Sequence, residues 1–196
     1  MQKHRLAACV TAAGLVATAA ITAGGMTTAS AQTKAKAPVS QVKVVVGPIS
    51  APGGESVARC PDDMRVLNGG YNAITFSKSG GGDPYDGVQA NAPTQDGKGW
   101  FADLMTGQVQ ARAVCVPAAE APQVVVGPTS GEHADSDAVC PEGTGVVGGG
   151  YVAESWYKNG YGESTDDVTA NAPRSGGDGW YARLFAGKVQ ARALCS

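Results

Sequence analysis

The sequence has few of the side chains that metal sites and histidine-dependent catalysis need. It holds two histidines in 196 residues and no Cys-x-x-Cys pair. Zinc and haem sites use such ligands at close spacing, so we expect no metal and no cofactor. His133 is the only histidine beyond the first few residues, and it lies in the polar turn SGEHADSD. Because a catalytic triad needs a base beside a nucleophile, we interpret His133 as a surface residue and the chain as non-enzymatic.

The sequence also lacks an excess of positive charge. The full chain has 15 Lys and Arg against 17 Asp and Glu. Without Lys3 and Arg5, which belong to the segment described next, 13 basic residues remain against 17 acidic ones, a net charge of −4. This balance gives no electrostatic attraction to nucleic acid or to an anionic membrane. We therefore expect no nucleic-acid partner and no stable membrane insertion of the mature chain.

Residues 1–31 have the pattern of a secretory signal peptide. A short basic start is followed by an uncharged stretch, residues 6–25, and then by the small residues Ala29-Ser30-Ala31. This order predicts cleavage before Gln32 and a secreted, extracellular protein. A membrane anchor is the alternative. The stretch is long enough for one, but it is rich in Ala, Gly and Thr and a cleavage pattern follows it.

Four cysteines remain after the signal peptide, because Cys9 leaves with it. They are Cys60, Cys115, Cys140 and Cys195. An even number of cysteines in an exported chain indicates disulfides.

The sequence matches itself when it is shifted by 80 residues. Residues 42–116 align with 122–196 without a gap, and 36 of the 75 positions are identical. Such self-similarity indicates a tandem duplication. We therefore expect a flexible tether at 32–41, a first β repeat at 42–116, a short linker at 117–121 and a second β repeat at 122–196.

Each repeat has the hydrophobic alternation of β-strands. In VQARAVC, residues 109–115, apolar and polar side chains alternate, and GWFADLM, residues 99–105, shows the same period of two. Glycine-rich turns separate about six such short segments, and no segment has a helical period. The sequence predicts an all-β protein with two tandem small antiparallel β-sandwich or barrel units, each with one disulfide. Four cysteines allow three pairings, and the duplication favours Cys60–Cys115 with Cys140–Cys195.

The motif CPEGTGVVGGGY, followed by GDGWYARL and VQARALC, resembles a module of uncharacterised exported proteins from high-GC Gram-positive bacteria. The likeness covers residues 60–115 and 140–195. The first repeat departs from it at CPDDMRVLNGGY, which has two glycines where the second repeat has five. The resemblance implies secretion, β structure and the disulfide, and it implies no activity.

Polar residues on the strands are candidates for a ligand-binding patch. They recur at matching positions of the two repeats: Asn91, Gln110 and Arg112, then Asn171, Gln190 and Arg192. The alternative is that they form the outer face of a sheet or that the arginines satisfy buried carbonyl groups.

Two further features allow a functional and a structural interpretation. Trp100 and Trp180 could stack on sugar rings, but each shares its strand face with Ala and Leu, which favours a core position. Carboxylates in glycine-rich loops could bind calcium. They are Asp83 and Asp86 in the first repeat, and Glu163 and Asp166 in the second. Solvated turn residues are the favoured interpretation.

The face of the GWFADLM strand opposite Trp100 suggests contact between the repeats. It carries Phe101, Asp103 and Met105, and the matching residues of the second repeat are Tyr181, Arg183 and Phe185. One hypothesis is that the two strands dock about a two-fold axis with Asp103 paired to Arg183. Ordinary divergence at a surface position is the favoured alternative.

Together these features predict a secreted, non-enzymatic structural or binding protein at the cell wall or cell surface. Its partner would be a cell-wall polymer or another extracellular molecule. A secreted carbohydrate-binding or inhibitor protein with a defined ligand is the alternative, and a hydrolase that uses Asp or Glu is less favoured.

Overall fold

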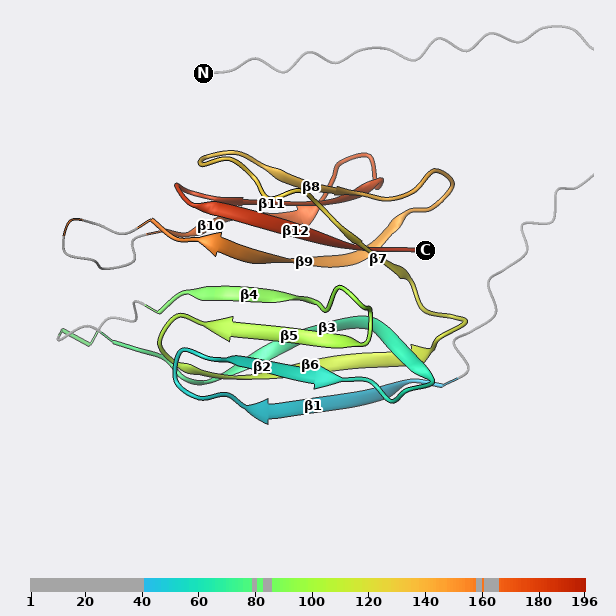
Figure 1. The fold of residues 1–196 in the computed structure, drawn as a ribbon, viewed down its shortest axis with the longest axis horizontal. Helices are drawn as coiled ribbons and strands as arrows, with labels where there is room; N and C mark the ends of the chain where they lie inside the picture. The colour runs from blue at the N-terminus through green and yellow to red at the C-terminus, as the bar shows by residue number, and fades with distance from the viewer. Residues whose placement is uncertain (1–40, 79–80, 83–85, 158–159, 161–165) are drawn as a thin grey trace, which may run out of the picture. The chain divides into compact units, whose positions relative to one another are not determined.

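The computed structural model describes residues 41–78, 81–82, 86–157, 160 and 166–196, and every regular element in these residues is a β-strand (Figure 1). The expected all-β class is therefore confirmed. None of the described residues forms a helix that could cross a membrane.

The first repeat is a sandwich of two antiparallel three-stranded sheets, with the strand orders β1-β6-β3 and β2-β5-β4. Its strands are β1 (Lys43–Ile49), β2 (Glu55–Arg59), β3 (Met64–Thr75), β4 (Val88–Pro93), β5 (Gly99–Leu104) and β6 (Gln108–Pro117).

The second repeat has the same strand order in both of its sheets, β7-β12-β9 and β10-β11-β8. Its strands are β7 (Gln123–Val126), β8 (Ser136–Val139), β9 (Val146–Ser155), β10 (Val168–Pro173), β11 (Gly179–Leu184) and β12 (Lys188–Cys195). The described residues thus form two antiparallel sandwich units of six strands each, as the sequence predicts.

Alternation along each strand sends one set of side chains into the core of its sandwich. On β5, Trp100, Ala102 and Leu104 are buried inside the first repeat. The indole lies so close to Gly69 on β3 that a Cβ there would overlap the ring. Gly149 stands in the same relation to Trp180 in the second repeat. A glycine opposite each tryptophan therefore lets the two sheets approach around a large side chain.

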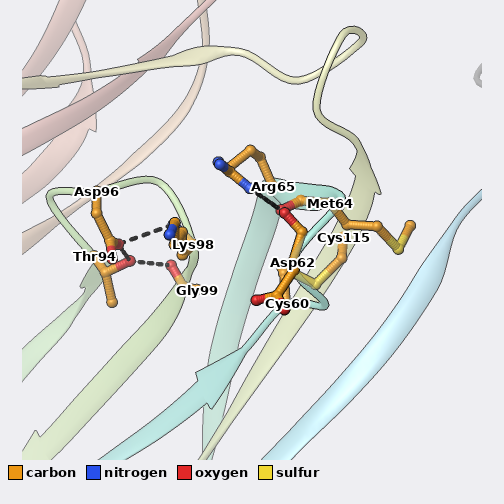
Figure 2. Close-up of a disulfide and its surroundings, with 9 residues drawn as sticks. All are labelled: Cys60, Asp62, Met64, Arg65, Thr94, Asp96, Lys98, Gly99 and Cys115. Carbon is orange, nitrogen blue, oxygen red and sulfur yellow. Dashed lines mark hydrogen bonds between the residues drawn. A yellow bond between two sulfur atoms is a disulfide. The ribbon is translucent and has the colours of Figure 1, made fainter.

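The disulfides pair as predicted, one in each repeat. Cys60 follows β2 and bonds to Cys115 on β6, with the Cα atoms 5.7 Å apart (Figure 2). Cys140 follows β8 and bonds to Cys195 on β12, with the Cα atoms 5.6 Å apart. Each bond therefore joins the two sheets of its sandwich.

A buried serine makes a second link between the sheets. The Ser56 hydroxyl donates to the Pro48 carbonyl at 2.5 Å and accepts from the Ala111 amide at 2.9 Å. Ser136 makes the equivalent bonds in the second repeat, to Pro128 at 2.6 Å and from Ala191 at 2.8 Å. Both hydroxyls are fully satisfied, so their burial costs little.

The two repeats lie in one compact unit and share a hydrogen-bonded sheet. Strand β4 pairs with β9, so that six strands follow the order β2-β5-β4-β9-β12-β7. Around this pairing, Ala90, Ala92 and Phe101 form a small apolar cluster with Val152 of the second repeat. Leu194 of β12 is buried in the core cluster of the first repeat. We call this contact between the repeats the seam.

Candidate ligand-binding cleft

A cleft of about 730 Å³ opens in the second repeat, where the loop before β8, the end of β9 and the turn after β11 meet. It is lined by Glu132, His133, Ser155, Trp156, Tyr157, Phe185, Ala186 and Gly187. Four of these eight residues have aromatic rings, which is a high share for a chain so poor in aromatic residues.

His133 fixes one wall of the cleft. Its backbone has φ 58°, in the left-handed region that histidine adopts more readily than most residues. Its Nδ1 lies 2.7 Å from the Phe185 carbonyl, which can only accept, so Nδ1 carries the hydrogen of this bond. The imidazole also meets the Phe185 ring edge to face, with the ring centroids 6.4 Å apart. The bond and the ring contact together hold Phe185 in a defined position while its side chain stays 63% exposed.

Asp166 ties together the turns that line the cleft. Its buried carboxylate accepts hydrogen bonds from the backbone amides of Tyr157 at 3.0 Å, Ala186 at 2.9 Å and Gly187 at 2.6 Å. Charge-assisted bonds of this kind are stronger than neutral ones. These bonds therefore hold the backbone of the turns that carry Tyr157 and Phe185.

Two aromatic rings of the cleft differ in what they contact. Tyr157 is 54% exposed, whereas Trp156 is half-buried and its indole lies against Gly87 of the first repeat. The Trp156 Nε1 hydrogen is buried and has no hydrogen-bond partner among the described residues. Tyr157 and Phe185 consequently present exposed aromatic surface, and Trp156 closes the side of the cleft next to the seam.

The first repeat has no equivalent aromatic set. Gly53, Ser77 and Met105 stand at the positions of His133, Tyr157 and Phe185. The carboxylate is retained, since Asp86 accepts from the backbone amides of Ser77 at 3.2 Å and Thr106 at 3.0 Å. The turn is thus common to both repeats, and the aromatic walls belong to the second alone.

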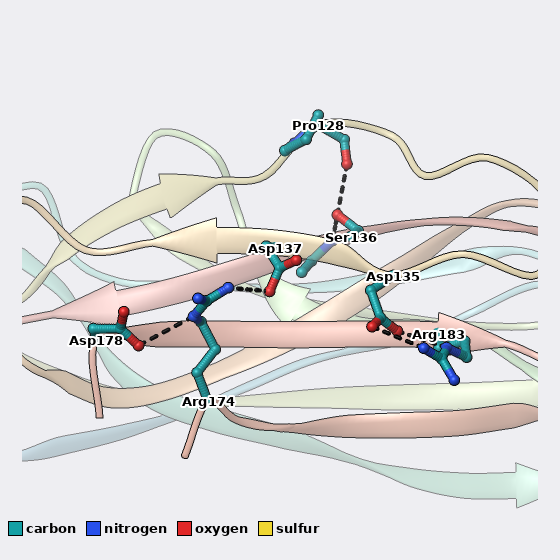
Figure 3. Close-up of polar contacts among 8 residues, drawn as sticks. Pro128, Asp135, Ser136, Asp137, Arg174, Asp178 and Arg183 are labelled. Carbon is teal, nitrogen blue, oxygen red and sulfur yellow. Dashed lines mark hydrogen bonds and ion pairs between the residues drawn. The ribbon is translucent and has the colours of Figure 1, made fainter. Parts of the chain in front are cut away.

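A second hollow, on the outer face of β8 and β11, is polar. Figure 3 shows the ion pairs at this face. Arg174 forms an ion pair with Asp137 and lies 3.1 Å from Asp178. Arg183 binds both carboxylate oxygens of Asp135, at 2.6 and 2.8 Å. Because both arginines already have carboxylate partners, neither offers a free positive charge to a ligand.

The predicted pairing of Asp103 with Arg183 is wrong. Arg183 is bonded to Asp135 of its own repeat, and Asp103 has a buried oxygen, Oδ1, without a hydrogen-bond partner. The face that carries Phe101 is covered, as its apolar side chains suggested, but β9 and β12 cover it rather than the matching strand.

The six polar residues predicted to bind a ligand do not gather in one hollow. Asn91 and Asn171 each bind a tryptophan, since their amide oxygens accept the indole hydrogens of Trp100 and Trp180 at 2.7 Å. Arg192 is buried at the seam and donates to a backbone carbonyl. The remaining three are Gln110 and Arg112 on β6 and Gln190 on β12.

The two tryptophans occupy the structural positions that the sequence favoured. Trp100 is 1% exposed, and Trp180 packs against the core of the second repeat. Their indole bonds to Asn91 and Asn171 explain why both asparagines recur.

Of the candidate calcium ligands, Asp83 and Glu163 lie outside the described residues. Asp86 and Asp166 bind backbone amides. No group of three His, Cys, Asp or Glu side chains in the described part of the chain is placed to hold a metal ion.

Sequence reasoning missed the aromatic cleft, although a signal for it was present. Alignment of the two repeats shows that the second has aromatic or imidazole side chains at His133, Tyr157 and Phe185, where the first has none. These positions are far apart in the sequence, so only the fold brings them together. Comparison with known protein families and with characterised proteins gives no match for this chain.

Proposed function

We propose that this chain is an exported, non-enzymatic binding protein whose ligand site is the aromatic cleft of the second repeat. The ligand class is a sugar ring of a cell-wall or cell-surface polymer. The proposal depends above all on the exposed aromatic surface of Tyr157 and Phe185, held by the buried Asp166 carboxylate.

The chemistry of the cleft suits a sugar. The apolar face of a pyranose ring packs on an exposed aromatic ring, and its hydroxyl groups need polar partners at the rim. Glu132 and Ser155 supply such groups beside the rings. An apolar peptide segment would use the rings but would leave these polar groups without a role.

Binding can be measured by calorimetric titration of the purified chain with soluble N-acetylglucosamine oligosaccharides and peptidoglycan fragments. Removal of one stacking ring costs about 0.5–1.5 kcal/mol, so Tyr157→Ala together with Phe185→Ala should weaken binding by about tenfold or more. Val139→Ala removes a comparably exposed side chain from the other end of β8 and should leave binding unchanged. Wild-type chain that binds none of these glycans would contradict the sugar assignment.

Export has a separate test. The signal pattern and the two disulfides support a location outside the cytoplasm, where thiols are oxidised. The protein collected from the culture fluid should begin at Gln32. An intact N-terminus in a cytoplasmic, thiol-reduced chain would contradict export.

A further inference from the structure

The seam joins two non-equivalent faces of the repeats. The first repeat contributes the outer face of β4 and β5, and the second contributes β9 and β12. The Arg192 guanidinium donates to the Pro93 carbonyl at 2.7 Å and lies 4.9 Å above the Phe101 ring. The Tyr151 hydroxyl donates to the Val88 carbonyl at 2.9 Å. A contact of this head-to-tail kind uses one face of each repeat and leaves the other free.

The unused faces are the counterparts of those that meet at the seam. In the first repeat the free face is that of β3 and β6, which corresponds to β9 and β12. In the second it is that of β10 and β11, which corresponds to β4 and β5. Both β3 and β10 are edge strands, each with a hydrogen-bonded neighbour on one side only. An unpaired edge is a ready place for a further strand.

The outer face of β3 and β6, together with the free edge of β3, retains the residues by which its counterpart contacts the first repeat, and we call it the β3 face. Gly70, Tyr71 and Arg112 match Gly150, Tyr151 and Arg192. Tyr71 is 40% exposed where Tyr151 is 5% exposed. A Cβ at Gly70 would meet nothing within 4 Å, whereas one at Gly150 would overlap the Asn91 backbone.

An exposed apolar side chain extends the same β3 face. Val44 on β1 is 61% exposed. Its counterpart, Val124 on β7, packs against the core of the first repeat. The β3 face therefore resembles, in its residues and its open space, the face by which the second repeat contacts the first at the seam.

The β10 strand is the matching other half. Five of its six residues are identical to those of β4, although only 36 of the 75 aligned positions are identical over the whole repeats. Tyr181 stands at the position that matches Phe101, whose ring lies under Arg192 in the seam. Ala172 is half-buried, whereas Ala92, its counterpart at the seam, is fully buried.

We propose that a second molecule of this chain docks on the first by repeating the seam, with β10 of one molecule added to β3 of the next. In the register of the seam, Ala170 would lie opposite Asn72 and Asn171 opposite Tyr71. Arg112 would donate to the Pro173 carbonyl and stack on Tyr181. Because every docked molecule again exposes one β3 and one β10, the assembly is open-ended.

The contact between molecules is weaker than the seam. Asn72 and Asp137 replace Val152 and Val57, which belong to the apolar cluster of the seam. Within one molecule, the linker also holds the two repeats together, which raises their effective concentration. Association of separate molecules therefore depends on protein concentration.

Sedimentation velocity of the purified chain over a concentration series tests the proposal. The weight-average mass should rise with concentration for the wild type and for Gly131→Val, a control at an exposed glycine with only Ala134 nearby. Gly70→Val fills the space that the added strand needs and should weaken association by about tenfold or more. Arg112→Ala removes an exposed side chain without filling any space, and it should also weaken association.

A mixing experiment establishes the head-to-tail geometry. Gly70→Val blocks the β3 face, and Ala172→Arg blocks the β10 face. Each variant should be monomeric alone, and the mixture should form dimers of one molecule of each and nothing larger. Circular dichroism and unfolding of each variant verify that it folds.

Three results would overturn the proposal. They are a wild-type chain that stays monomeric at every concentration, association insensitive to both Gly70→Val and Arg112→Ala, and a mixture that stays monomeric. The inference is independent of the sugar cleft, because the residues of the two faces lie outside that cleft. Glycan binding and self-association can therefore fail separately.

Discussion

The two repeats share a strand order, a disulfide and a serine link, yet they differ wherever one of them is covered by the other. Arg192 is 7% exposed at the seam, whereas the identical Arg112 is exposed on the first repeat. Val152 contacts the apolar cluster of the seam, and Asn72 takes its place on the free face. The comparison teaches that position in the assembly, more than membership in a repeat, decides the environment of each residue.

The largest expected effect concerns a feature that the repeats share. Each disulfide closes a loop of 55 residues, and a loop of this length stabilises by about 4 kcal/mol. Replacing Cys60 and Cys115 by serine should lower the free energy of unfolding by that amount, and the Cys140 and Cys195 pair should behave alike. Urea unfolding under non-reducing conditions measures both. Unequal losses in the free energy of unfolding would show that the two disulfides are not equivalent.

A glycine pair gives the sharpest contrast between the covered and the free face. A side chain at Gly150 would overlap the Asn91 backbone and lie 2.7 Å from the Ala92 Cα, while Gly70 has open space. Overpacking costs about 1–3 kcal/mol, so Gly150→Val should destabilise the dilute protein by about 3 kcal/mol. Gly70→Val should change stability by less than about 0.5 kcal/mol. Thermal unfolding at low concentration compares the two, and equal effects would contradict the described seam.

Substitution of Arg192 and of Arg112 should likewise change the free energy of unfolding unequally, but by less than substitution of the two glycines. Arg192→Ala removes a buried hydrogen bond to the Pro93 carbonyl and a cation–π contact, together worth about 2 kcal/mol. Arg112→Ala should cost less than about 0.5 kcal/mol in the monomer. Denaturant unfolding at one low protein concentration provides the measurement. A stability loss on Arg112→Ala as large as that on Arg192→Ala would show that the two environments do not differ.

The smallest effect concerns a half-buried carboxylate on β5, Asp103. Burial, followed by the charge of Glu55, raises the pKa of Asp103 above its ordinary value of 3.8. In the pH range between those two pKa values the folded state binds more protons than the unfolded state, so stability falls as pH rises. Asp103→Asn should therefore stabilise the protein at pH 7, and this gain should shrink below the ordinary aspartate pKa.

Asp135→Asn is the matched control for Asp103→Asn. It removes the carboxylate that binds Arg183 on the free face of the second repeat, and it should not stabilise the protein. Unfolding of both variants at pH 3 and pH 7 measures the difference. An Asp103→Asn variant less stable than the wild type at pH 7 would contradict the assigned cost of the buried charge.

The fold was predictable from the sequence because its signals are local and repeated. Alternation around Trp100 identifies the inward face of β5, and the duplicated cysteines identify the two pairings. The seam was not predictable in the same way. It pairs β4 with β9, which are not equivalent strands, whereas a two-fold axis would bring equivalent strands together. It also places Arg192 over the Phe101 ring, although nothing in the sequence connects these two residues. The cleft is likewise made of residues from three separate turns, so no local pattern reveals it.

The disulfides also determine how the chain responds to a pulling force. Cys60–Cys115 and Cys140–Cys195 carry the load directly from strand to strand, so the 55-residue loops that they close cannot lengthen even after the sandwiches lose their structure. At roughly 3.5 Å for each residue, every loop withholds about 190 Å of contour length. Under tension an oxidised molecule is thus a shorter tether than a reduced one, because reduction would release the length of both loops.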